Sequence, residues 1–241
     1  MKLVEARFVT SAADAKGIPA DGVPHIALVG RSNVGKSTLI NALSGSRIAR
    51  TSAAPGKTRL ANLYRLTVDG GAGGPGRWSV HFVDLPGYGY ARGGAQSVAE
   101  LREIAEAYFA SARAPDAVAR NFGSGHPGDP ADPAATAAGA RNFSSGDPAD
   151  RGRYRIAGVL HLVDARHPAL DADADAARWL DTLGVEHVLV ATKLDKLSRG
   201  ERVKNLKELE RKLGKAALPV SAARGEGLDD LWTLIARLSR Q

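Results

Sequence analysis

The sequence predicts an α/β fold with a mostly parallel central sheet and helices on both faces. Short apolar runs alternate with longer amphipathic segments along most of the chain, which is the pattern of strands joined by crossover helices. The first run, residues 25–29, leads through a glycine-rich loop straight into the next amphipathic segment. With 241 residues and 44% hydrophobic content, the chain can bury the core of a single domain, 1–241.

The expected elements follow from the spacing of apolar residues. Residues 1–24 form an extended lead-in whose apolar pattern is too weak to assign further. Alternation at 60–68 and 77–83, on either side of a glycine-rich connection, predicts a hairpin, and 46–58 is expected to be a loop. The other expected strands are 25–29, 156–163, 185–191 and 217–220, and the expected helices are 36–43, 96–112, 172–183, 198–213 and 228–238.

Residues 114–153 differ in character from the rest of the chain. They are rich in Ala, Gly, Pro, Asp and Ser and contain an internal repeat, in which the segment 119–125 recurs at 140–146. Such a composition buries too little apolar area to offset the entropy of ordering it. We therefore expect a disordered insertion, and a tolerated duplication without a role is the simplest account of it.

Composition narrows the class of protein. Without cysteine the chain forms neither disulfides nor thiolate metal sites. Residues 1–17 lack the apolar core of a signal peptide, and the strongest apolar run, 156–163, is too short to span a bilayer. We expect a cytoplasmic monomer that does not act at a membrane.

The segment Gly30-Arg31-Ser32-Asn33-Val34-Gly35-Lys36-Ser37 matches the phosphate-binding pattern G-x-x-x-x-G-K-[ST] without a mismatch. A strand, this loop and a helix that continues through Thr38 would surround a polyphosphate with backbone N–H groups and a positive helix end. Lys36 would reach the β- and γ-phosphates, and the Ser37 hydroxyl would bind Mg²⁺.

Two further segments complete a nucleotide site. Asp84-Leu85-Pro86-Gly87 follows the strand of the hairpin; Asp84 can hold Mg²⁺ indirectly through water, and the Gly87 N–H can meet the γ-phosphate. Gly56-Lys57-Thr58 lies in the loop before the hairpin, where Thr58 can close over Mg²⁺ and the γ-phosphate. Lys36, Thr58 and Gly87 are therefore the candidate catalytic groups, and Ser37, Thr58 and Asp84 the candidate metal ligands.

The choice of base depends on Thr192-Lys193-Leu194-Asp195 and Ser221-Ala222-Ala223, which follow two other predicted strands. The Asp195 carboxylate can accept hydrogen bonds from N1–H and the 2-amino group of guanine, whereas adenine would leave it desolvated and unpaired. The Lys193 stem would lie along the base, and a backbone N–H of the second segment would meet the guanine O6. Each of these two segments alone is typical of an ordinary turn. Together with the phosphate loop and 84–87, however, they make four motifs that all fall at carboxyl ends of predicted strands, where open α/β sheets bind ligands.

The chain resembles the EngB (YihA/YsxC) family of ribosome-biogenesis GTPases. The resemblance is carried by 30–37, by Asp84-Leu-Pro-Gly-Tyr-Gly-Tyr-Ala91, by Pro55-Gly-Lys-Thr-Arg59 and by Asp164-Ala-Arg-His-Pro168, and it covers nearly all of the chain except about 114–153. It implies a P-loop GTPase fold, Mg²⁺-dependent hydrolysis of GTP to GDP and phosphate, and a role in assembly of the large (50S) ribosomal subunit. The large subunit or its precursor, with its rRNA and ribosomal proteins, is then the expected partner, and a need for this protein in normal cell division is a further implication.

Hydrolysis is expected to be slow. Tyr88 follows Gly87, where many GTPases have a glutamine that orients the attacking water. Asn33 leaves two interpretations open. In related GTPases an asparagine at this loop position coordinates a K⁺ ion in the place of an arginine finger, and the alternative is an ordinary loop hydrogen bond.

Two basic zones suggest contact with RNA. Residues 46–66 carry five basic and no acidic residues. On the helix predicted at 198–213, Val203, Leu206, Leu209 and Leu213 are expected to be buried, which exposes a basic stripe of Lys204, Lys207, Arg211 and Lys215. A solvated helix face is the commoner explanation of such a stripe, and attraction to the RNA backbone is the functional one.

Two functions of other classes remain open at this stage. The first is a nucleotide-gated binding adaptor whose hydrolysis is incidental. The second is a GTPase acting on tRNA or at membranes, against which the chain offers neither an added domain nor an amphipathic anchor.

Overall fold

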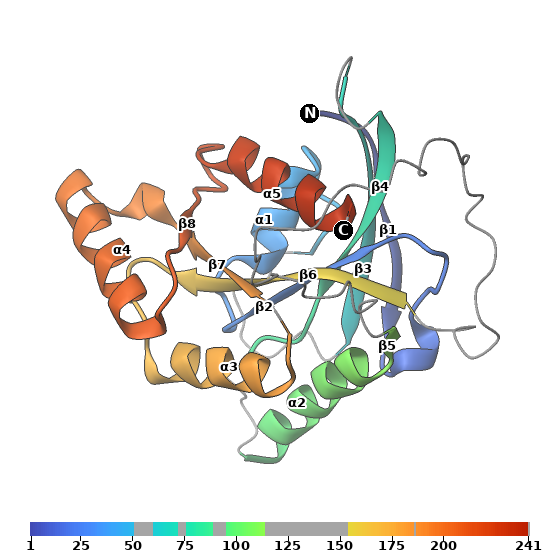
Figure 1. The fold of residues 1–241 in the computed structure, drawn as a ribbon, viewed down its shortest axis with the longest axis horizontal. Helices are drawn as coiled ribbons and strands as arrows, with labels where there is room; N and C mark the ends of the chain where they lie inside the picture. Colours follow the sequence, from blue (N-terminus) through green and yellow to red (C-terminus); the bar gives the residue numbers. More distant parts are fainter. Residues whose placement is uncertain (51–59, 72–75, 89–94, 114–153, 186, 241) are drawn as a thin grey trace, which may run out of the picture.

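The computed structural model describes residues 1–50, 60–71, 76–88, 95–113, 154–185 and 187–240 (Figure 1). The strands are β1 (Lys2–Ala12), β2 (His25–Gly30), β3 (Ala61–Asp69), β4 (Arg77–Asp84), β5 (Ala112–Arg113), β6 (Tyr154–Asp164), β7 (His187–Thr192) and β8 (Leu218–Pro219). The α-helices are α1 (Lys36–Leu43), α2 (Ala95–Ala110), α3 (Asp171–Thr182), α4 (Arg199–Leu213) and α5 (Leu228–Arg240), with short 3₁₀ turns η1 (Ala15–Gly17) and η3 (Leu194–Lys196).

The strands form one sheet in the order β1-β3-β4-β2-β6-β7-β8, and the short β5 pairs with β6. The pairs β1·β3 and β3·β4 are antiparallel, and the other pairs are parallel. The expected hairpin is therefore β3–β4, with Asp69 opposite Arg77. The mostly parallel α/β sheet predicted from the sequence is confirmed.

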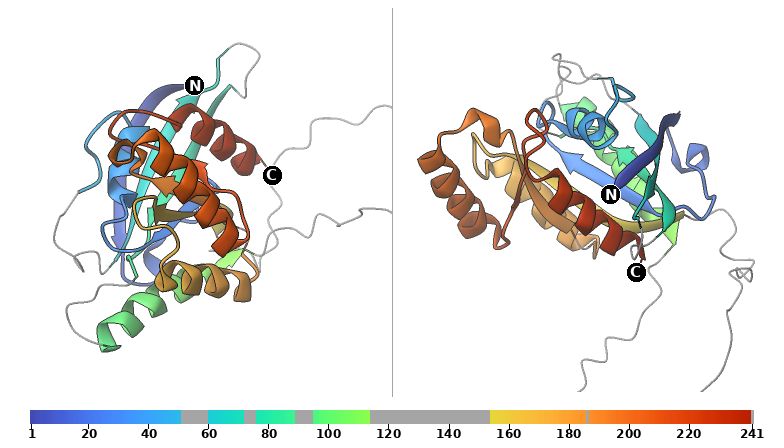
Figure 2. Two further views of the ribbon diagram at one scale, coloured as in Figure 1. Left: turned by 90° about the vertical axis from the view of Figure 1, so that its left-hand side faces the viewer. Right: turned by 90° about the horizontal axis from the view of Figure 1, so that it is seen from above.

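Helices cover both faces of the sheet, as Figures 1 and 2 show. Successive residues of β2 point to opposite faces, so Ile26 and Leu28 join the core under α1 and α5, whereas Ala27 and Val29 join the core under α2 and α3. Helix α4 lies beyond the β8 edge and packs through Leu209 on a smaller apolar cluster. This arrangement leaves the carboxyl ends of β2, β4, β6 and β7 at one edge of the sheet, where the loops that carry the motifs begin.

The structure assigns one segment that the sequence left open and corrects one expectation. The lead-in 1–24 contains β1, a strand that pairs with β3 along most of its length. Its residues are mostly exposed, so the alternation that marks a half-buried strand is weak. On α4, Val203 is 54% exposed rather than buried. The partly buried position is Arg202, whose guanidinium pairs with Glu226 and donates to the Leu197 carbonyl. Arg202 precedes Leu206 by four residues and so continues the stripe that Leu206, Leu209 and Leu213 pack on the core.

The expected insertion at 114–153 and the loop residues 51–59 lie outside the described part of the chain. In the described part, no helix is long and apolar enough to cross a membrane.

Candidate functional site

The phosphate-loop segment connects β2 to α1 in a tight turn. Gly35 has φ of 115° and Asn33 has φ of 63°, both in the left-handed region that favours glycine. A Cβ on Gly30 would lie 2.8 Å from Val34 Cγ1 and 2.9 Å from the Leu162 carbonyl oxygen, so a side chain there would displace the backbone of β6 or the loop itself. The two glycines of the motif are thus required by this backbone, whichever anion it holds.

Lys36 places a buried cation at the start of α1. Its side chain is 8% exposed, and its Nζ donates to the Gly30 carbonyl at 3.2 Å. Burial lowers the pKa of Lys36 and the Asp84 carboxylate raises it, although Lys36 makes no ion pair within the described part of the chain. A desolvated ammonium whose one hydrogen-bond partner among the described residues is a carbonyl is suited to receive an anion such as a phosphate.

Ser37 and Asp84 form a pair of oxygen donors next to Lys36. The Ser37 hydroxyl donates to Asp84 Oδ2 at 2.8 Å, while Asp84 Oδ1 is buried and has no hydrogen-bond partner among the described residues. Burial raises the pKa of Asp84, against the effect of Lys36. Among the described residues there is no group of three or more His, Asp or Glu side chains that could hold a metal ion. The Ser37 hydroxyl and the Asp84 carboxylate together fit a Mg²⁺ ion that takes its remaining ligands from phosphate and water.

Gly87 lies against the phosphate loop. A Cβ at this position would be 2.8 Å from the Ser32 nitrogen and 2.9 Å from Lys36 Nζ. The Gly87 carbonyl accepts from the Ser32 hydroxyl at 3.3 Å, and the next carbonyl, of Tyr88, accepts from the Ser32 N–H at 3.0 Å. The end of β4 and the phosphate loop are therefore in direct contact.

The expected base-recognition segments are joined to the phosphate loop as well. The single hydroxyl proton of Thr192 is shared between two carbonyls, with Oγ1 at 2.8 Å from the Val34 oxygen and at 3.1 Å from the Val163 oxygen. Lys193, with φ of 62°, donates from Nζ to the Asn33 carbonyl at 2.6 Å. These bonds bring the end of β7 against the loop, although 158 residues separate Thr192 from Val34.

Asp195 lies one turn further on, in η3. Its Oδ1 accepts from the Ser221 hydroxyl at 2.8 Å, and Lys196 lies 3.5 Å from its Oδ2. Burial raises the pKa of Asp195, but the hydrogen bond from Ser221 and the charge of Lys196 lower it by more. The net shift is downward, so the group is a carboxylate at neutral pH. Ser221 is fully buried, and Ala222 and Ala223 continue the turn that it begins. A charged acceptor is thus held in place beside the loop that follows β8.

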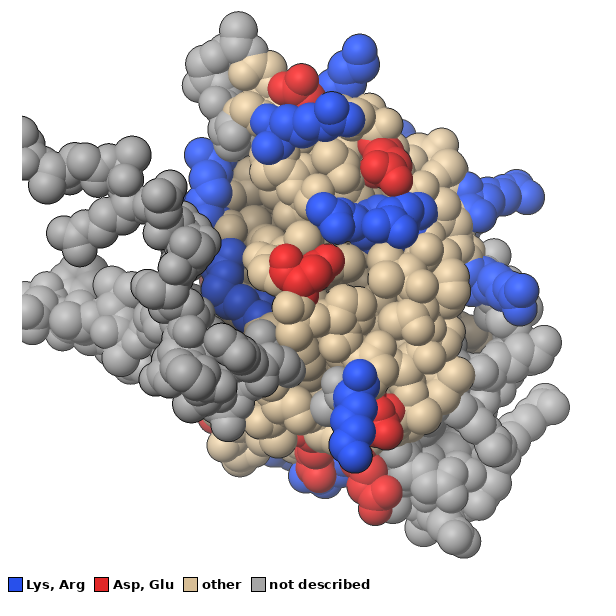
Figure 3. All heavy atoms as spheres, turned by 90° about the vertical axis from the view of Figure 1, so that its right-hand side faces the viewer, with Lys and Arg blue, Asp and Glu red and all other residues tan. Residues whose placement is uncertain are grey.

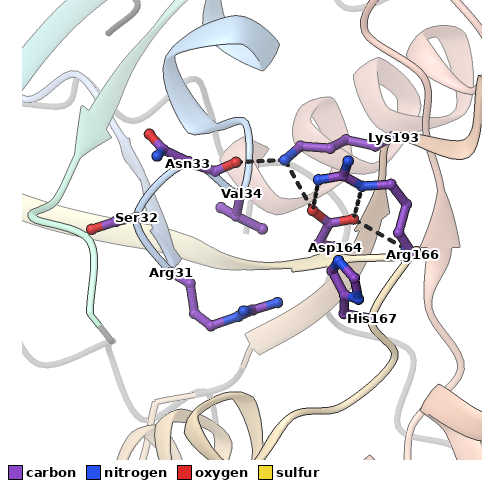
Figure 4. Close-up of a pocket in the computed structure, with 8 residues that line it drawn as sticks. All are labelled: Arg31, Ser32, Asn33, Val34, Asp164, Arg166, His167 and Lys193. Atoms are coloured by element: carbon purple, nitrogen blue, oxygen red, sulfur yellow. Dashed lines mark hydrogen bonds and ion pairs between the residues drawn. The ribbon is translucent and has the colours of Figure 1, made fainter. Parts of the chain in front are cut away.

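A pocket of about 340 Å³ opens beside the phosphate loop (Figure 4). Lys193 reaches across it to Asn33 and to Asp164, whose Oδ2 is 2.9 Å from Nζ. Arg166 also contacts Asp164, through Nε at 3.0 Å and Nη2 at 2.8 Å. Burial raises the pKa of Asp164, but these donors lower it to about 2. Asp164 therefore fixes the Lys193 side chain along the wall of the pocket.

The structure brings together the site residues of 30–38, 84–87, 192–195 and 221–223 at one edge of the sheet. Gly56, Lys57 and Thr58 lie outside the described residues. Sequence reasoning missed Asp173, which contacts both Arg31 and Tyr88. The local pattern marks Asp173 only as an acidic residue in the first turn of a helix, so no local feature indicates these contacts.

Known proteins match this chain both through a family model and along nearly its whole length. Residues 25–120 match the family model described as 50S ribosome-binding GTPase. The chain is 33% identical over 240 residues to the probable GTP-binding protein EngB of Heliobacterium modesticaldum, covering 98% of this chain and 92% of that protein. It is 31% identical over 246 residues to the probable GTP-binding protein EngB of Clostridioides difficile, covering 100% of this chain and 96% of that one.

Solved structures share the fold. A crystal structure of Era in complex with MgGDPNP and nucleotides 1506–1542 of 16S ribosomal RNA superposes with a TM-score of 0.60 at 21% identity, covering 90% of this chain and 57% of that one. A single-residue variant of Aquifex aeolicus Era bound to GDP·AlF₄⁻ superposes with a TM-score of 0.58 at 20% identity, again covering 90% of this chain and 57% of that one. At this identity the likeness establishes the P-loop GTPase fold alone.

Proposed function

The chain belongs to the EngB family of GTP-binding proteins, and from that premise we propose which of its residues bind and hydrolyse GTP and on which particle it acts. The chain is a GTPase. In our proposal the N–H groups of 30–38 surround the β- and γ-phosphates, and Lys36 contacts them directly. Ser37 and Asp84 hold Mg²⁺, the latter through water, and Thr58 completes the metal site.

The observation that carries this assignment is the buried Lys36 ammonium near Asp84, whose Oδ1 has no hydrogen-bond partner in the described part of the chain. Both groups are taken out of water without a full set of partners, which costs several kcal/mol unless a ligand compensates. A triphosphate with Mg²⁺ offers each of them the partner it lacks. Bound Mg²⁺ would neutralise charge on the β–γ bridge, and the Gly87 N–H would stabilise the γ-phosphate oxygens.

Guanine selectivity is assigned to Asp195, with Lys193 along the base and the turn Ser221-Ala222-Ala223 at its O6. The support is electrostatic: Asp195 is a charged acceptor held by Ser221, and guanine but not adenine has two adjacent donors for it.

Slow intrinsic hydrolysis is a further part of the proposal. The hydroxyl of Tyr88, which replaces the usual glutamine, is engaged with His161 and Asp173 and so is not available to orient water. Asn33 is the candidate ligand of a K⁺ ion that would stabilise the transition state, since its backbone projects this residue at the rim of the loop.

For the partner, we propose the large ribosomal subunit or its precursor, with the protein acting as a nucleotide-dependent switch in its assembly and thereby supporting normal cell division. The description of the matching family model, a 50S ribosome-binding GTPase, supports it. So does the basic stripe, whose four residues are all exposed, three of them on α4 and Lys215 just beyond its end. By contrast, Figure 3 shows Lys and Arg interspersed with Asp and Glu on the face at the right of Figure 1.

Co-sedimentation with 50S particles tests this proposal. We expect more protein in the pellet with a non-hydrolysable GTP analogue than with GDP or without nucleotide, and faster GTP turnover when particles are present. Binding that is unaffected by nucleotide, with unchanged turnover, would instead favour an adaptor whose hydrolysis is incidental. Failure to bind in any nucleotide state would remove the ribosomal role and leave the GTPase intact.

A further inference from the structure

A buried hydrogen-bond chain joins the phosphate loop to the residue after Gly87. Arg31 Nε donates to Asp173 Oδ1 at 3.0 Å, and the Tyr88 hydroxyl donates to the same oxygen at 3.2 Å. His161 Nε2 lies 2.7 Å from the Tyr88 hydroxyl. One carboxylate oxygen thus receives donors from two segments that follow different strands of the sheet.

The neutral His161 ring and the single hydroxyl proton of Tyr88 together determine which group donates in each hydrogen bond of this chain. Burial lowers the pKa of His161 to about 3, so the imidazole is neutral at pH 7. Because Tyr88 gives its only proton to Asp173, the ring must donate from Nε2 to the Tyr88 oxygen. His161 Nδ1 is then the unprotonated nitrogen, and it has no hydrogen-bond partner among the described residues. Every donor in the chain therefore points toward Asp173.

Asp173 is itself rigidly held. It is fully buried at the first turn of α3, and its second oxygen accepts from the Leu170 N–H at 3.2 Å. Burial raises its pKa, while Arg31 and Tyr88 lower it. The bonds from Arg31 and from the Leu170 N–H hold the two oxygens of the carboxylate, so Asp173 can fix the position of the Tyr88 hydroxyl.

Tyr88 transmits this position to Gly87. Its carbonyl accepts from the Ser32 N–H at 3.0 Å while its hydroxyl is held at Asp173, so both the main chain and the side chain of Tyr88 are fixed. Gly87, the adjacent residue, lies in contact with Ser32 and Lys36. Removing the hydroxyl bond would leave two bonds from Ser32 among the described residues, one to the Tyr88 carbonyl at 3.0 Å and a longer one to the Gly87 carbonyl at 3.3 Å, to hold the Gly87 N–H in position.

Helix α3 also contacts the helix that follows this segment. Trp179 Nε1 donates to Glu106 Oε1 at 3.3 Å, and the Trp179 ring meets that of Phe109 with centroids 5.7 Å apart. The same helix therefore anchors Tyr88 through Asp173 and α2 through Trp179, on either side of the residues 89–94 in the sequence.

We propose that Asp173 is a positioning residue for GTP hydrolysis: through Tyr88 it holds the Gly87 N–H against the phosphate loop, where that group meets the γ-phosphate. Nothing in the ground state of bound GDP depends on this position, because GDP has no γ-phosphate. The inference rests on the proposed role of Gly87, and it adds a function for a residue outside the nucleotide motifs.

The test compares Tyr88→Phe, Asp173→Asn and the double variant, with GDP affinity, KM for GTP and kcat measured for each. Tyr88→Phe keeps the ring and removes the hydroxyl. We expect kcat to fall about tenfold while KM and GDP affinity stay within roughly twofold, because a small displacement of a catalytic donor is costly for rate rather than for binding. If Asp173 acts through Tyr88, the double variant should be no slower than Asp173→Asn alone.

Tyr154→Phe is the matched control. This variant also loses a buried tyrosine hydroxyl, one that donates to the Tyr108 carbonyl in the core under α2, and it should lower stability without changing kcat. An unchanged kcat in Tyr88→Phe, an equal loss in Tyr154→Phe, or additive losses in the double variant would overturn the positioning role. Absence of turnover in the unsubstituted protein would contradict the assignment of the GTPase residues as well, so the two failures are distinguishable.

Discussion

Thr192 donates its hydroxyl proton to the Val34 carbonyl at 2.8 Å across 158 residues of sequence. The neighbouring Lys193 makes a parallel bond to the Asn33 carbonyl at 2.6 Å. These two bonds fix the end of β7 to the phosphate loop, so the distance from the loop to Asp195 is set by the backbone. For a nucleotide with its phosphates in the loop and its base at Asp195, as proposed, the distance between phosphates and base is therefore fixed by the protein.

Asp195→Asn should reverse base preference. The amide offers a donor where the carboxylate accepted, so GTP should bind about 100-fold more weakly, the loss of one or two bonds to a charged group, and xanthosine triphosphate should gain. Competition of GTP, XTP and ATP against a fluorescent GDP measures this. Ser221→Ala, which removes the hydroxyl that holds Asp195, is the control: it should weaken binding less and keep the order GTP over XTP. Equal affinity for ATP and GTP in the unsubstituted protein would contradict the assignment of Asp195.

Ser37→Ala should uncouple nucleotide affinity from Mg²⁺. The substitution removes the hydroxyl that lies 2.8 Å from Asp84 Oδ2, and with it one oxygen of the expected metal site. Affinity for GTP should fall about tenfold or more in Mg²⁺ and change little in EDTA, because the phosphate contacts of Lys36 remain. Calorimetric titrations in the two buffers give both numbers. The same loss in EDTA would mean that the hydroxyl acts on the loop and not through a metal.

Turnover should be faster in KCl than in NaCl at equal ionic strength. The reason is that the Tyr88 hydroxyl is engaged at Asp173, so another positive or orienting group must assist hydrolysis, and Asn33 at the loop rim is the candidate ligand for K⁺. Steady-state phosphate release in the two salts measures the difference, and Asn33→Ala should abolish it while leaving the rate in NaCl nearly unchanged. Identical rates in KCl and NaCl would leave Asn33 with an ordinary loop hydrogen bond.

Local spacing in the sequence indicates the candidate site residues that lie close together, and it misses those that meet only in the fold. The phosphate loop needs Gly30, Gly35 and Lys36 within a few residues of each other, so spacing alone indicates them. The roles proposed for Asp84 and Asp195 follow from their position after strands, which an alternating α/β pattern places at one edge.

Asp173 had no such indication, because its partners Arg31 and Tyr88 lie 142 and 85 residues away and meet it only when α3 packs beside β6. The same reasoning applies to the fold. Strand β1 depends on pairing with β3, and the exposure of Val203 depends on which side of α4 packs on the rest of the fold; the local pattern contains neither.

Stability should fall as the solution is acidified below about pH 6.5. Burial lowers the pKa of His25 and of His161 to about 3, from an unfolded value near 6.5. Above pH 6.5 neither state binds these protons, and the stability is fully present; below it only the unfolded state does, so the free energy of unfolding falls by up to about 1.4 kcal/mol per pH unit for each histidine. Urea titrations at pH 7, 6 and 5 measure the slope.

His25→Phe is the variant that isolates one of these histidines. It retains an aromatic ring stacked on Tyr154, whose centroid is 4.7 Å away, and removes the titrating group. Its slope between pH 6 and pH 5 should be smaller than that of the unsubstituted protein by about 1 kcal/mol per pH unit. An unchanged slope would mean that His25 is not a source of the acid sensitivity.

Reversing charge on the basic stripe should weaken binding to 50S particles without changing GTP affinity. Lys204 and Lys207 are the better positions, because Arg211 is already engaged with both oxygens of Glu208, at 2.9 and 2.7 Å, and its substitution would remove that two-bond contact. If the stripe contacts RNA phosphates, the double variant Lys204→Glu, Lys207→Glu should bind more weakly. The slope of log K against log salt should also fall by roughly 0.7–0.9 for each phosphate contact that is lost.

Arg178→Glu with Arg237→Glu, on α3 and α5, is the control: it changes the net charge equally and should affect binding far less. Equal losses in the two double variants would show that total charge matters and that α4 is not the docking surface.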